Sequence, residues 1–327
     1  MNFNEVIAHY HEELLAVEKE LLNIFQGTPT LLPTIGYHII NSGGKRLRPL
    51  FLLLSADLCG SKSDNKIHLA AIIEAIHTAS LLHDDVIDRA DTRRGKPSAN
   101  SKWGNQIVIL VGDYLYSNAL RLAVLQKNQK IMETLSFATT KMTEAEILQL
   151  EKTADPDISI EDYYKIISGK TAVLISSACK IGAIIANQSP QVEDRLMDFG
   201  KNTGIAFQLV DDVLDYSANP KTLGKKLGKD LEEGKITMPL ISLLKNSPSE
   251  VSSEVRDIVK NYANIKDKKA TMERIRTFFS EYKSIDESMA VALDFINQAK
   301  ECINIFEPSI TKQRLIALAE YSLKRQK

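Results

Sequence analysis

Long proline-free stretches with apolar residues at every third or fourth position run through most of this chain. DRLMDFGKNTGIAFQLVDDVLDY and ITKQRLIALAEYSLKRQK show the spacing of amphipathic helices. The alternation typical of β-strands is missing, as are Asn-Gly and Asp-Gly hairpin turns. No low-complexity linker interrupts the pattern, so we predict a single all-α domain over residues 1–327. Loops are expected near 27–34, 60–65, 89–105, 153–160, 187–191, 216–236 and 245–249.

Length and composition exclude several classes of protein. The chain has 327 residues, 44% of them apolar, which is enough for a large core. Its net charge of −1 gives no electrostatic reason to bind nucleic acid. No uninterrupted apolar run approaches the roughly 20 residues of a membrane span, and the N-terminal stretch MNFNEVIAHYHEELLAVEKE does not resemble a signal peptide. We expect a soluble cytoplasmic protein without a transmembrane segment, in which the three cysteines are reduced thiols.

Two of the apolar stretches each carry three aspartates with the spacing DDxxD. The first and last aspartates of such a motif lie on one face of a helix, where their like charges repel. Most acidic clusters are solvated surface faces, but AIHTASLL and GIAFQLV, which precede these two, are apolar enough to be core. Buried acidic clusters need a cation, so we predict that the two motifs face each other across a cavity that holds divalent metal. The aspartates are Asp84, Asp85 and Asp88 in the first motif and Asp211, Asp212 and Asp215 in the second.

The residues around the aspartates indicate which metal and which ligand. Carboxylate oxygens without a Cys or His cluster suit Mg²⁺, with Mn²⁺ as a possible substitute, and bound Mg²⁺ typically bridges carboxylates to substrate phosphates. A basic loop follows each motif, and arginine offers a two-pronged fit to phosphate. The sequence therefore predicts two metal–polyphosphate sites. The basic residues are Arg93 and Arg94 after the first motif and Lys221, Lys225, Lys226, Lys229 and Lys235 after the second.

A further anion site is suggested by NSGGKRLRPLF at residues 41–51. Gly43 and Gly44 allow close approach of the backbone to a ligand, and Lys45, Arg46 and Arg48 concentrate positive charge. Taken alone, such a loop is more often a solvated turn.

Two other features carry weak signals. SGKTA at 168–172 looks like half of a nucleotide-binding loop, but the first glycine of that loop is missing and no strand precedes it. His77 lies on the same helical stripe as Asp84, where a lone histidine is more often a satisfied core residue.

These segments together resemble one enzyme family. GGKRLRP, HTASLLHDDVIDRADTRRG, GKTA, FQLVDDVLD and the lysine-rich loop ending GKITMP occur in this order and spacing in trans-prenyltransferases. The chain is most similar to long-chain polyprenyl diphosphate synthases of the octaprenyl or solanesyl type. The resemblance covers a catalytic core of about residues 35–325, after an N-terminal helical extension over residues 1–30. It implies an all-α isoprenoid-synthase fold around a central cavity, a homodimer, and the two aspartate motifs at the mouth of the cavity.

The resemblance also implies a role for particular residues. Metal would be held by Asp84, Asp88 and Asp211, supported by Asp85, Asp212 and Asp215. The allylic diphosphate would contact Arg93, Lys170, Thr171, Gln208, Lys225 and Lys235, where Lys226 is an alternative to Lys225. Isopentenyl diphosphate would contact Lys45, Arg48, His77 and Arg94. Lys170 is counted with the six aspartates as catalytic.

The implied reaction needs no protein nucleophile. Mg²⁺ and cationic side chains neutralise the leaving diphosphate, and an apolar pocket protects the allylic cation from water. The resemblance also implies a long-chain product that serves as a precursor of quinone side chains, and such a product would favour peripheral contact with a membrane. A terpene cyclase or head-to-head synthase shares the fold but does not need GGKRLRP. A non-catalytic subunit or helical scaffold would be free to lose aspartates, whereas this chain keeps all six.

Two further expectations concern product length and assembly. A tail that leaves the metals along the helix of the first motif passes Ala79 and Ser80, then Ile76, and the small side chains at the first level predict a hexaprenyl-to-nonaprenyl product. The helix over 106–125 is too continuously apolar for an exposed position. The resemblance places it at a subunit contact, and burial within one subunit is the alternative.

Overall fold

The computed structural model describes residues 1–217 and 228–324. The chain forms two compact units, which we call unit 1 and unit 2 and describe separately. Unit 1 comprises Met1–Thr140, Leu174–Gly200 and Cys302–Leu318. Unit 2 comprises Lys141–Val173, Lys201–Glu301 and Ala319–Lys327. The expectation of one domain with a helical extension over residues 1–30 stays a prediction.

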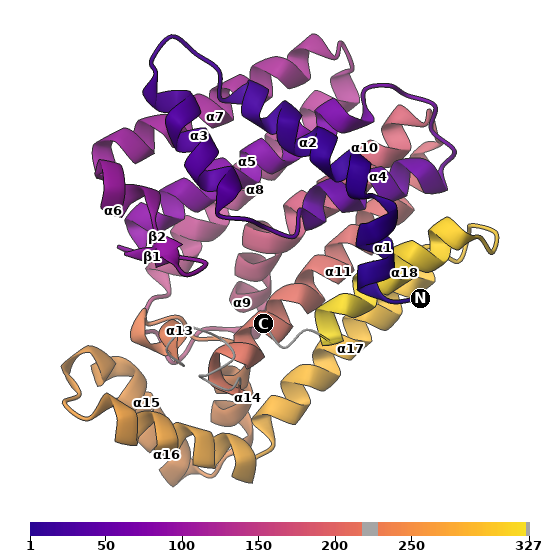
Figure 1. The fold of residues 1–327 in the computed structure, drawn as a ribbon. Helices are drawn as coiled ribbons and strands as arrows, with labels where there is room; N and C mark the ends of the chain where they lie inside the picture. Colours follow the sequence, from indigo (N-terminus) through magenta and orange to yellow (C-terminus); the bar gives the residue numbers. More distant parts are fainter. Residues whose placement is uncertain (218–227, 325–327) are drawn as a thin grey trace. The chain divides into compact units, whose positions relative to one another are not determined.

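The first part of the chain supplies most of unit 1 (Figure 1). Its elements are α1 (Phe3–His9), α2 (His11–Ile24), α3 (Leu31–Asn41), α4 (Leu47–Leu58), α5 (Lys66–Ile87), β1 (Thr92–Arg93), β2 (Lys96–Pro97), α6 (Ala99–Trp103) and α7 (Asn105–Leu125). Helix α8 (Gln129–Glu151) begins in unit 1 and ends in unit 2.

The remaining elements follow in chain order. They are α9 (Ile160–Ile167), the π-helical turn η1 (Ser168–Ala172), α10 (Val173–Ile185), α11 (Pro190–Ser217), α13 (Lys229–Glu232), α14 (Met238–Asn246), α15 (Ser249–Asn261), the 3₁₀ turn η2 (Tyr262–Asn264), α16 (Lys268–Glu281), α17 (Ser284–Cys302) and α18 (Ile310–Lys324).

The predicted all-α class is confirmed. Among the described residues the only strands are β1 and β2, an antiparallel pair of two residues each, within the loop expected near 89–105. That predicted loop also contains the short helix α6, because Ser98 accepts a hydrogen bond from the backbone N–H of Ser101 and caps the helix. Local capping of this kind carries a weaker sequence signal than apolar periodicity.

Helix α5 is the central helix of unit 1. It packs against α2, α4 and α7 (Figure 1). Its residues from Leu69 to Ile76 are all buried, in agreement with the expectation that a helix apolar on every side lies in a core. The first aspartate motif is thereby placed at the C-terminal end of a helix that is fixed on several sides.

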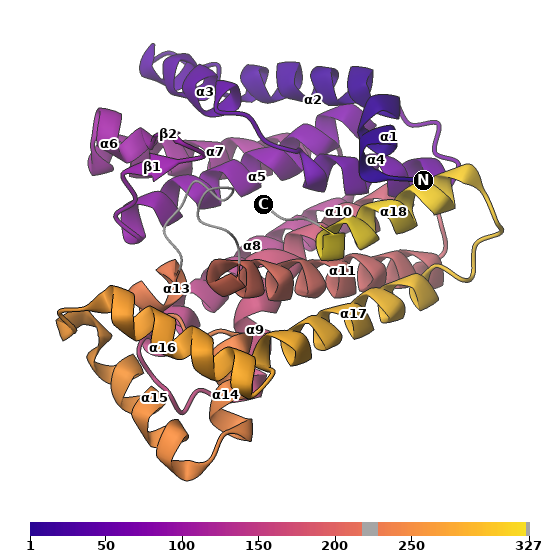
Figure 2. The same ribbon diagram turned by 60° about the horizontal axis from the view of Figure 1, so that its bottom comes forward.

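In unit 2, α14 contacts both α15 and α16 (Figure 2). The rings of Tyr216 at the end of α11 and Phe279 of α16 meet edge to face with centroids 5.0 Å apart. A Cβ atom added to Gly204 of α11 would lie 2.5 Å from the Cα atom of Ala172, so α11 and η1 pack closely. This close packing places the second aspartate motif beside the SGKTA turn.

Two helical stretches are long and apolar enough, by length and composition alone, to cross a membrane. They are Asn105–Leu125 and Ile160–Ile185, of which 33% and 78% of the most apolar window is buried in the protein. The second is mostly buried, as in the core helices of soluble proteins, and neither stretch firmly indicates a membrane span.

The cysteines Cys59, Cys179 and Cys302 form no disulfide with one another. Burial raises the pKa of Cys59 and of Cys179 to about 12, so both thiols stay protonated at neutral pH and are poor nucleophiles.

Candidate functional site: two aspartate motifs with separate cationic neighbours

The first aspartate motif ends helix α5. Asp84 and Asp88 are partly exposed, and the backbone N–H of Asp88 donates to the carbonyl of Asp84 at 2.8 Å, which places the two on one helical face. Arg89 then adopts a left-handed conformation (φ 50°) and the helix stops. The predicted pairing of the first and last aspartates on one face is therefore present.

The middle aspartate of this motif is buried. Asp85 is 3% exposed and is held by Arg93 of β1. Nε of Arg93 donates to both carboxylate oxygens at 2.9 Å, and its Nη2 lies 2.7 Å from Oδ1. The basic hairpin is thus anchored to α5, and removal of Arg93 would leave a buried carboxylate unpaired at a cost of about 3–5 kcal/mol. Arg93, predicted to contact diphosphate, is in this structure the partner of Asp85.

The glycine-containing loop before α4 brings arginines together. A Cβ atom on Gly44 would lie 2.8 Å from Nη1 of both Arg46 and Arg94, so the two guanidinium groups lie close to this backbone, and a side chain here would displace them. Arg46 is 6% exposed, with Nε 2.9 Å from Glu18 and Nη1 3.2 Å from Glu74. The sequence suggested that Arg46 adds charge for a ligand, but the structure places it in buried ion pairs.

His77 of α5 lies close enough to several arginines to be affected by their positive charge. Its pKa is held well below the usual range, first by burial and then by the positive charges of Arg48, Arg93, Arg94 and Arg46. His77 therefore interacts electrostatically with Arg48 and Arg94, and all three belong to the predicted isopentenyl diphosphate site. Lys45, the fourth predicted residue, is exposed near the end of the loop, next to Arg46.

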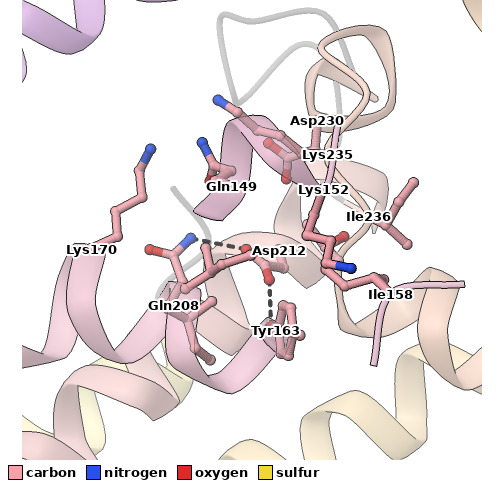
Figure 3. Close-up of a pocket in the computed structure, with 13 residues that line it drawn as sticks. Gln149, Lys152, Ile158, Tyr163, Lys170, Gln208, Asp212, Asp230, Lys235 and Ile236 are labelled. Atoms are coloured by element: carbon pink, nitrogen blue, oxygen red, sulfur yellow. Dashed lines mark hydrogen bonds between the residues drawn. The ribbon is translucent and has the colours of Figure 1, made fainter. Parts of the chain in front are cut away.

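The second aspartate motif lies on α11 in unit 2. Asp211 is partly exposed, whereas Asp212 is 2% exposed and accepts hydrogen bonds from Tyr163 Oη at 2.6 Å and from Gln208 Nε2 at 2.9 Å (Figure 3). Burial raises the pKa of Asp212 to about 7, and the charges of Asp211 and Asp215 add to the increase, while the two hydrogen bonds oppose it. The middle aspartate of each motif is thus buried among protein partners.

Asp215 contacts the start of α13. Its Oδ1 and Oδ2 accept from the backbone N–H groups of Lys229 and Asp230 at 3.2 and 3.0 Å, and its carbonyl accepts from the N–H of Gly228 at 2.9 Å. A negative charge at these amides stabilises the first turn of the helix. The predicted contacts Lys225 and Lys226, with Lys221, lie outside the described residues.

A pocket in unit 2 collects the other predicted allylic-site residues (Figure 3). Lys170 Nζ lies 2.5 Å from Glu146, and Lys235 Nζ lies 2.6 Å from Glu233, so each lysine has a carboxylate partner. The pocket is lined by Gln149, Lys152, Ile158, Tyr163, Ile166, Ile167, Lys170, Gln208, Asp212, Asp230, Lys235, Ile236 and Thr237.

Thr171 joins this group through its hydroxyl, which donates to Gln208 Oε1 at 2.6 Å. Both Thr171 and Lys170 belong to the π-helical turn η1, an uncommon element that often marks a functional position. The sequence had no signal for the π turn. It also gave none for Tyr163, which a search for charged motifs overlooks because tyrosine is neutral.

The donors present fit a hard divalent cation. Asp84, Asp88 and Asp211 offer partly exposed carboxylate oxygens, the ligand type that Mg²⁺ prefers. Asp85 and Asp215, also predicted as metal ligands, are engaged by Arg93 and by backbone amides. Within residues 1–217 and 228–324, no group of three or more His, Cys, Asp or Glu side chains could hold a metal ion by itself.

The residues predicted to line the product tail lie on α5. Ile76 and Ala79 are fully buried, and Ser80 is partly exposed with its hydroxyl donating to the carbonyl of His77 at 2.9 Å. Ala79 thus has a small buried side chain, and the Ser80 hydroxyl turns back to the backbone of its own helix.

Comparison with known proteins identifies the family. The family model for polyprenyl synthetase matches residues 29–275. The chain belongs to the polyprenyl synthetase family. Octaprenyl diphosphate synthase of Haemophilus influenzae is 37% identical, covering 99% of this chain and 98% of that protein. A short chain isoprenyl diphosphate synthase of Methanothermobacter thermautotrophicus is 34% identical, covering 100% and 99%.

Solved structures agree with this polyprenyl synthetase assignment. The crystal structure of a polyprenyl synthase from Caulobacter crescentus, complexed with calcium and isoprenyl diphosphate, has a TM-score of 0.93 at 33% identity and covers 100% of this chain and 98% of that one. The chain is therefore a chain-elongating trans-prenyltransferase with the all-α isoprenoid-synthase fold, and the resemblance stated from the sequence is confirmed.

The position of His77 predicts how stability depends on pH. Its pKa is lowered in the folded protein, whereas an unfolded histidine titrates near 6.5, so the unfolded state binds more protons as the pH falls through about 6.5. Because of His77, the free energy of unfolding therefore decreases as the pH falls from 7 to 5. In His77→Gln, urea unfolding should show a smaller decrease in the free energy of unfolding over this range.

His11→Gln is the matched control, because it removes an exposed histidine at the start of α2. Equal losses of stability in wild type and His77→Gln would contradict the assignment.

Proposed function

We propose that this trans-prenyltransferase extends an allylic diphosphate, such as farnesyl diphosphate, by successive head-to-tail condensations with isopentenyl diphosphate. The product is a long-chain all-trans polyprenyl diphosphate for quinone side chains. The observation that carries the proposal is that each aspartate motif has its own cationic neighbours. Two such clusters suit two different diphosphates, whereas a cyclase needs only one. The clusters are Arg48 and Arg94, beside the neutral ring of His77, in unit 1 and Lys170 and Lys235 in unit 2.

In this proposal the two substrates use different residues. Lys45, Arg48, His77 and Arg94 bind isopentenyl diphosphate, and His77 can donate a hydrogen bond as a neutral ring. The allylic diphosphate is held by Lys170, Thr171, Gln208 and Lys235, together with Arg93 and Lys225. A diphosphate in the unit 2 pocket competes with Glu146 and Glu233 for Lys170 and Lys235, since these carboxylates are their partners in the substrate-free protein.

Mg²⁺, or Mn²⁺ in its place, would be held by Asp84, Asp88 and Asp211, with Asp85, Asp212 and Asp215 in support. When bound, the metal neutralises charge on the leaving diphosphate. The lysines hold the diphosphate as its allylic C–O bond breaks and the electron pair leaves with oxygen. The double bond of isopentenyl diphosphate then forms the new C–C bond, and the proton released from it passes to the departing diphosphate. No protein nucleophile takes part.

The metal dependence tests this function. With Mg²⁺, farnesyl diphosphate and labelled isopentenyl diphosphate, chromatography should show a linear polyprenyl diphosphate, and EDTA should abolish it. Asp84→Ala and Asp211→Ala should each lower kcat by about 10²-fold or more, because an electrostatic interaction of the transition state is lost. Circular dichroism should show an unchanged helical fold.

Asp198→Ala changes an aspartate of α11 outside the motif and is the control. A cyclic or head-to-head product, or no product at all, would favour a cyclase or a non-catalytic subunit. Wild-type turnover in Asp84→Ala would rule out the proposed metal site.

Product length is part of the proposal because similar relatives are named for short-chain and octaprenyl products. We assign a product from hexaprenyl to nonaprenyl, with the tail passing Ala79 and Ser80 and then Ile76. Ala79 and Ala75 are both fully buried and lie one helical turn apart on α5. One turn advances about 5.4 Å, close to the length of one isoprene unit.

Ala79→Phe should therefore truncate the product toward farnesyl or geranylgeranyl diphosphate, and Ala75→Phe should stop it about one unit later. The readout is chromatography of the products, with the first condensation retained and thermal unfolding measured to detect overpacking. If neither substitution changes the product spectrum, the tail follows another route.

A homodimer is also proposed. Large apolar side chains are exposed near both ends of α7: Ile109 and Leu110 at 41% and 67%, Val124 and Leu125 at 55% and 57%. The alternative of a helix buried within one subunit does not fit this exposure. The same enzyme is expected in the cytoplasm, with peripheral contact to a lipid surface when the apolar product is released.

Light scattering should give about twice the 36.5 kDa of one chain at micromolar concentration. Leu110→Arg combined with Val124→Arg should weaken the dimer, whereas Leu15→Arg, at a similarly exposed leucine of α2, should leave it intact. A wild-type monomer at this concentration would disprove the dimer.

A further inference from the structure

Tyr163 of α9 is buried against the second aspartate motif. Its side chain is 2% exposed, and its hydroxyl donates to Oδ2 of Asp212 at 2.6 Å (Figure 3). Burial and the nearby charge of Asp212 hold the pKa of Tyr163 well above its usual range, so the phenol remains a neutral donor. A hydroxyl in this position is directed at Asp212 and away from solvent.

The hydrogen bond from Tyr163 is the first of a chain. Oδ1 of Asp212 accepts from Gln208 Nε2 at 2.9 Å, and Gln208 Oε1 accepts from Thr171 Oγ1 at 2.6 Å. This series of hydrogen bonds thus connects three elements of unit 2, namely α9, α11 and η1. Each oxygen of Asp212 has its own donor, and each end of the Gln208 amide has its own partner.

This series of hydrogen bonds fixes the orientation of the Gln208 amide. In the ionised form of Asp212 the carboxylate oxygen accepts, so the amide nitrogen faces Asp212, and the amide oxygen then faces the donating hydroxyl of Thr171. Loss of the Tyr163 hydroxyl would leave Oδ2 of a buried aspartate without this donor and would remove one of the two hydrogen bonds that hold the side chain of Asp212. Gln208 and Thr171 would lose their alignment with it.

We propose that Tyr163 is a positioning residue for the allylic-diphosphate site: it holds Asp212, and through Asp212 it sets Gln208 and Thr171 in the geometry that receives the diphosphate. The inference rests on the proposed function, because Gln208 and Thr171 are assigned there to the allylic substrate. The ring of Tyr163 lines the pocket, but no substrate contact is assigned to its hydroxyl. Its hydroxyl is engaged by Asp212, and its effect reaches the diphosphate only through that side chain.

The test is Tyr163→Phe, which removes one oxygen and keeps the ring. The KM for farnesyl diphosphate should rise, and kcat/KM for it should fall by about tenfold or more, the range expected when a hydrogen bond to a buried charged group is lost. The KM for isopentenyl diphosphate should not change, because its proposed residues belong to unit 1. A general loss of folding would affect both substrates alike.

Tyr164→Phe is the matched control. Tyr164 is the next residue of α9, and its ring meets Phe295 edge to face with centroids 5.8 Å apart. Deletion of its hydroxyl should leave both KM values as in the wild type. If Tyr163→Phe and Tyr164→Phe behave alike, Tyr163 has no positioning role.

A binding measurement separates this inference from the proposed function. Mg²⁺ with inorganic diphosphate should raise the thermal unfolding temperature of the wild type and of Tyr164→Phe, and should raise that of Tyr163→Phe less. A wild type that makes no polyprenyl diphosphate would refute the proposed function. An active wild type with equal thermal shifts in both variants would refute only the role of Tyr163.

A double-mutant cycle tests whether Tyr163 acts through Asp212. In an Asp212→Asn background the carboxylate partner is gone, so adding Tyr163→Phe should lower kcat/KM for farnesyl diphosphate much less than it does in the wild type. Independent, multiplicative effects of the two substitutions would show that Tyr163 acts by another route.

Discussion

The charges that surround the two aspartate motifs have to be balanced within the protein before any substrate arrives. Asp85 is balanced by Arg93, and Arg46 by Glu18 and Glu74. A buried charge without a partner costs several kcal/mol, so these ion pairs decide which side chains remain for a ligand. Asp84, Asp88 and Asp211 remain partly exposed, and these are the carboxylates that we propose for the metal.

The need to pair buried charges also explains why aspartates have different roles at different positions, and why arginines do. In each motif the middle aspartate is buried, whereas the first and the last are partly exposed. The middle positions, Asp85 and Asp212, tie the helix to a neighbouring element, and the first positions, Asp84 and Asp211, stay accessible. Arginines divide in the same way: Arg46 joins helices α2 and α5 through Glu18 and Glu74, whereas the side chain of Arg94 is exposed.

Much of the fold could be read from the sequence, because helical periodicity, the scarcity of strand patterns and the apolar flanks of Asp84 and Asp211 are properties of local segments. The family could be read for the same reason. The partners of individual charges could not: Glu18 lies far from Arg46 in sequence, and nothing in the spacing shows that they meet. Tyr163 was missed because its importance comes from one hydrogen bond across two helices.

The π-helical turn η1 has a consequence for helical phase. Tyr163 and Thr171 are eight residues apart, which in a regular α-helix would place them about 80° apart around the axis. The wider ladder of a π turn rotates less per residue and brings the two toward the same side, facing Gln208 and Asp212 on α11. The turn therefore acts as a spacer in rotation: it takes up one extra residue between Tyr163 and Thr171, because a regular α-helix would align two such side chains at a separation of seven residues and not eight.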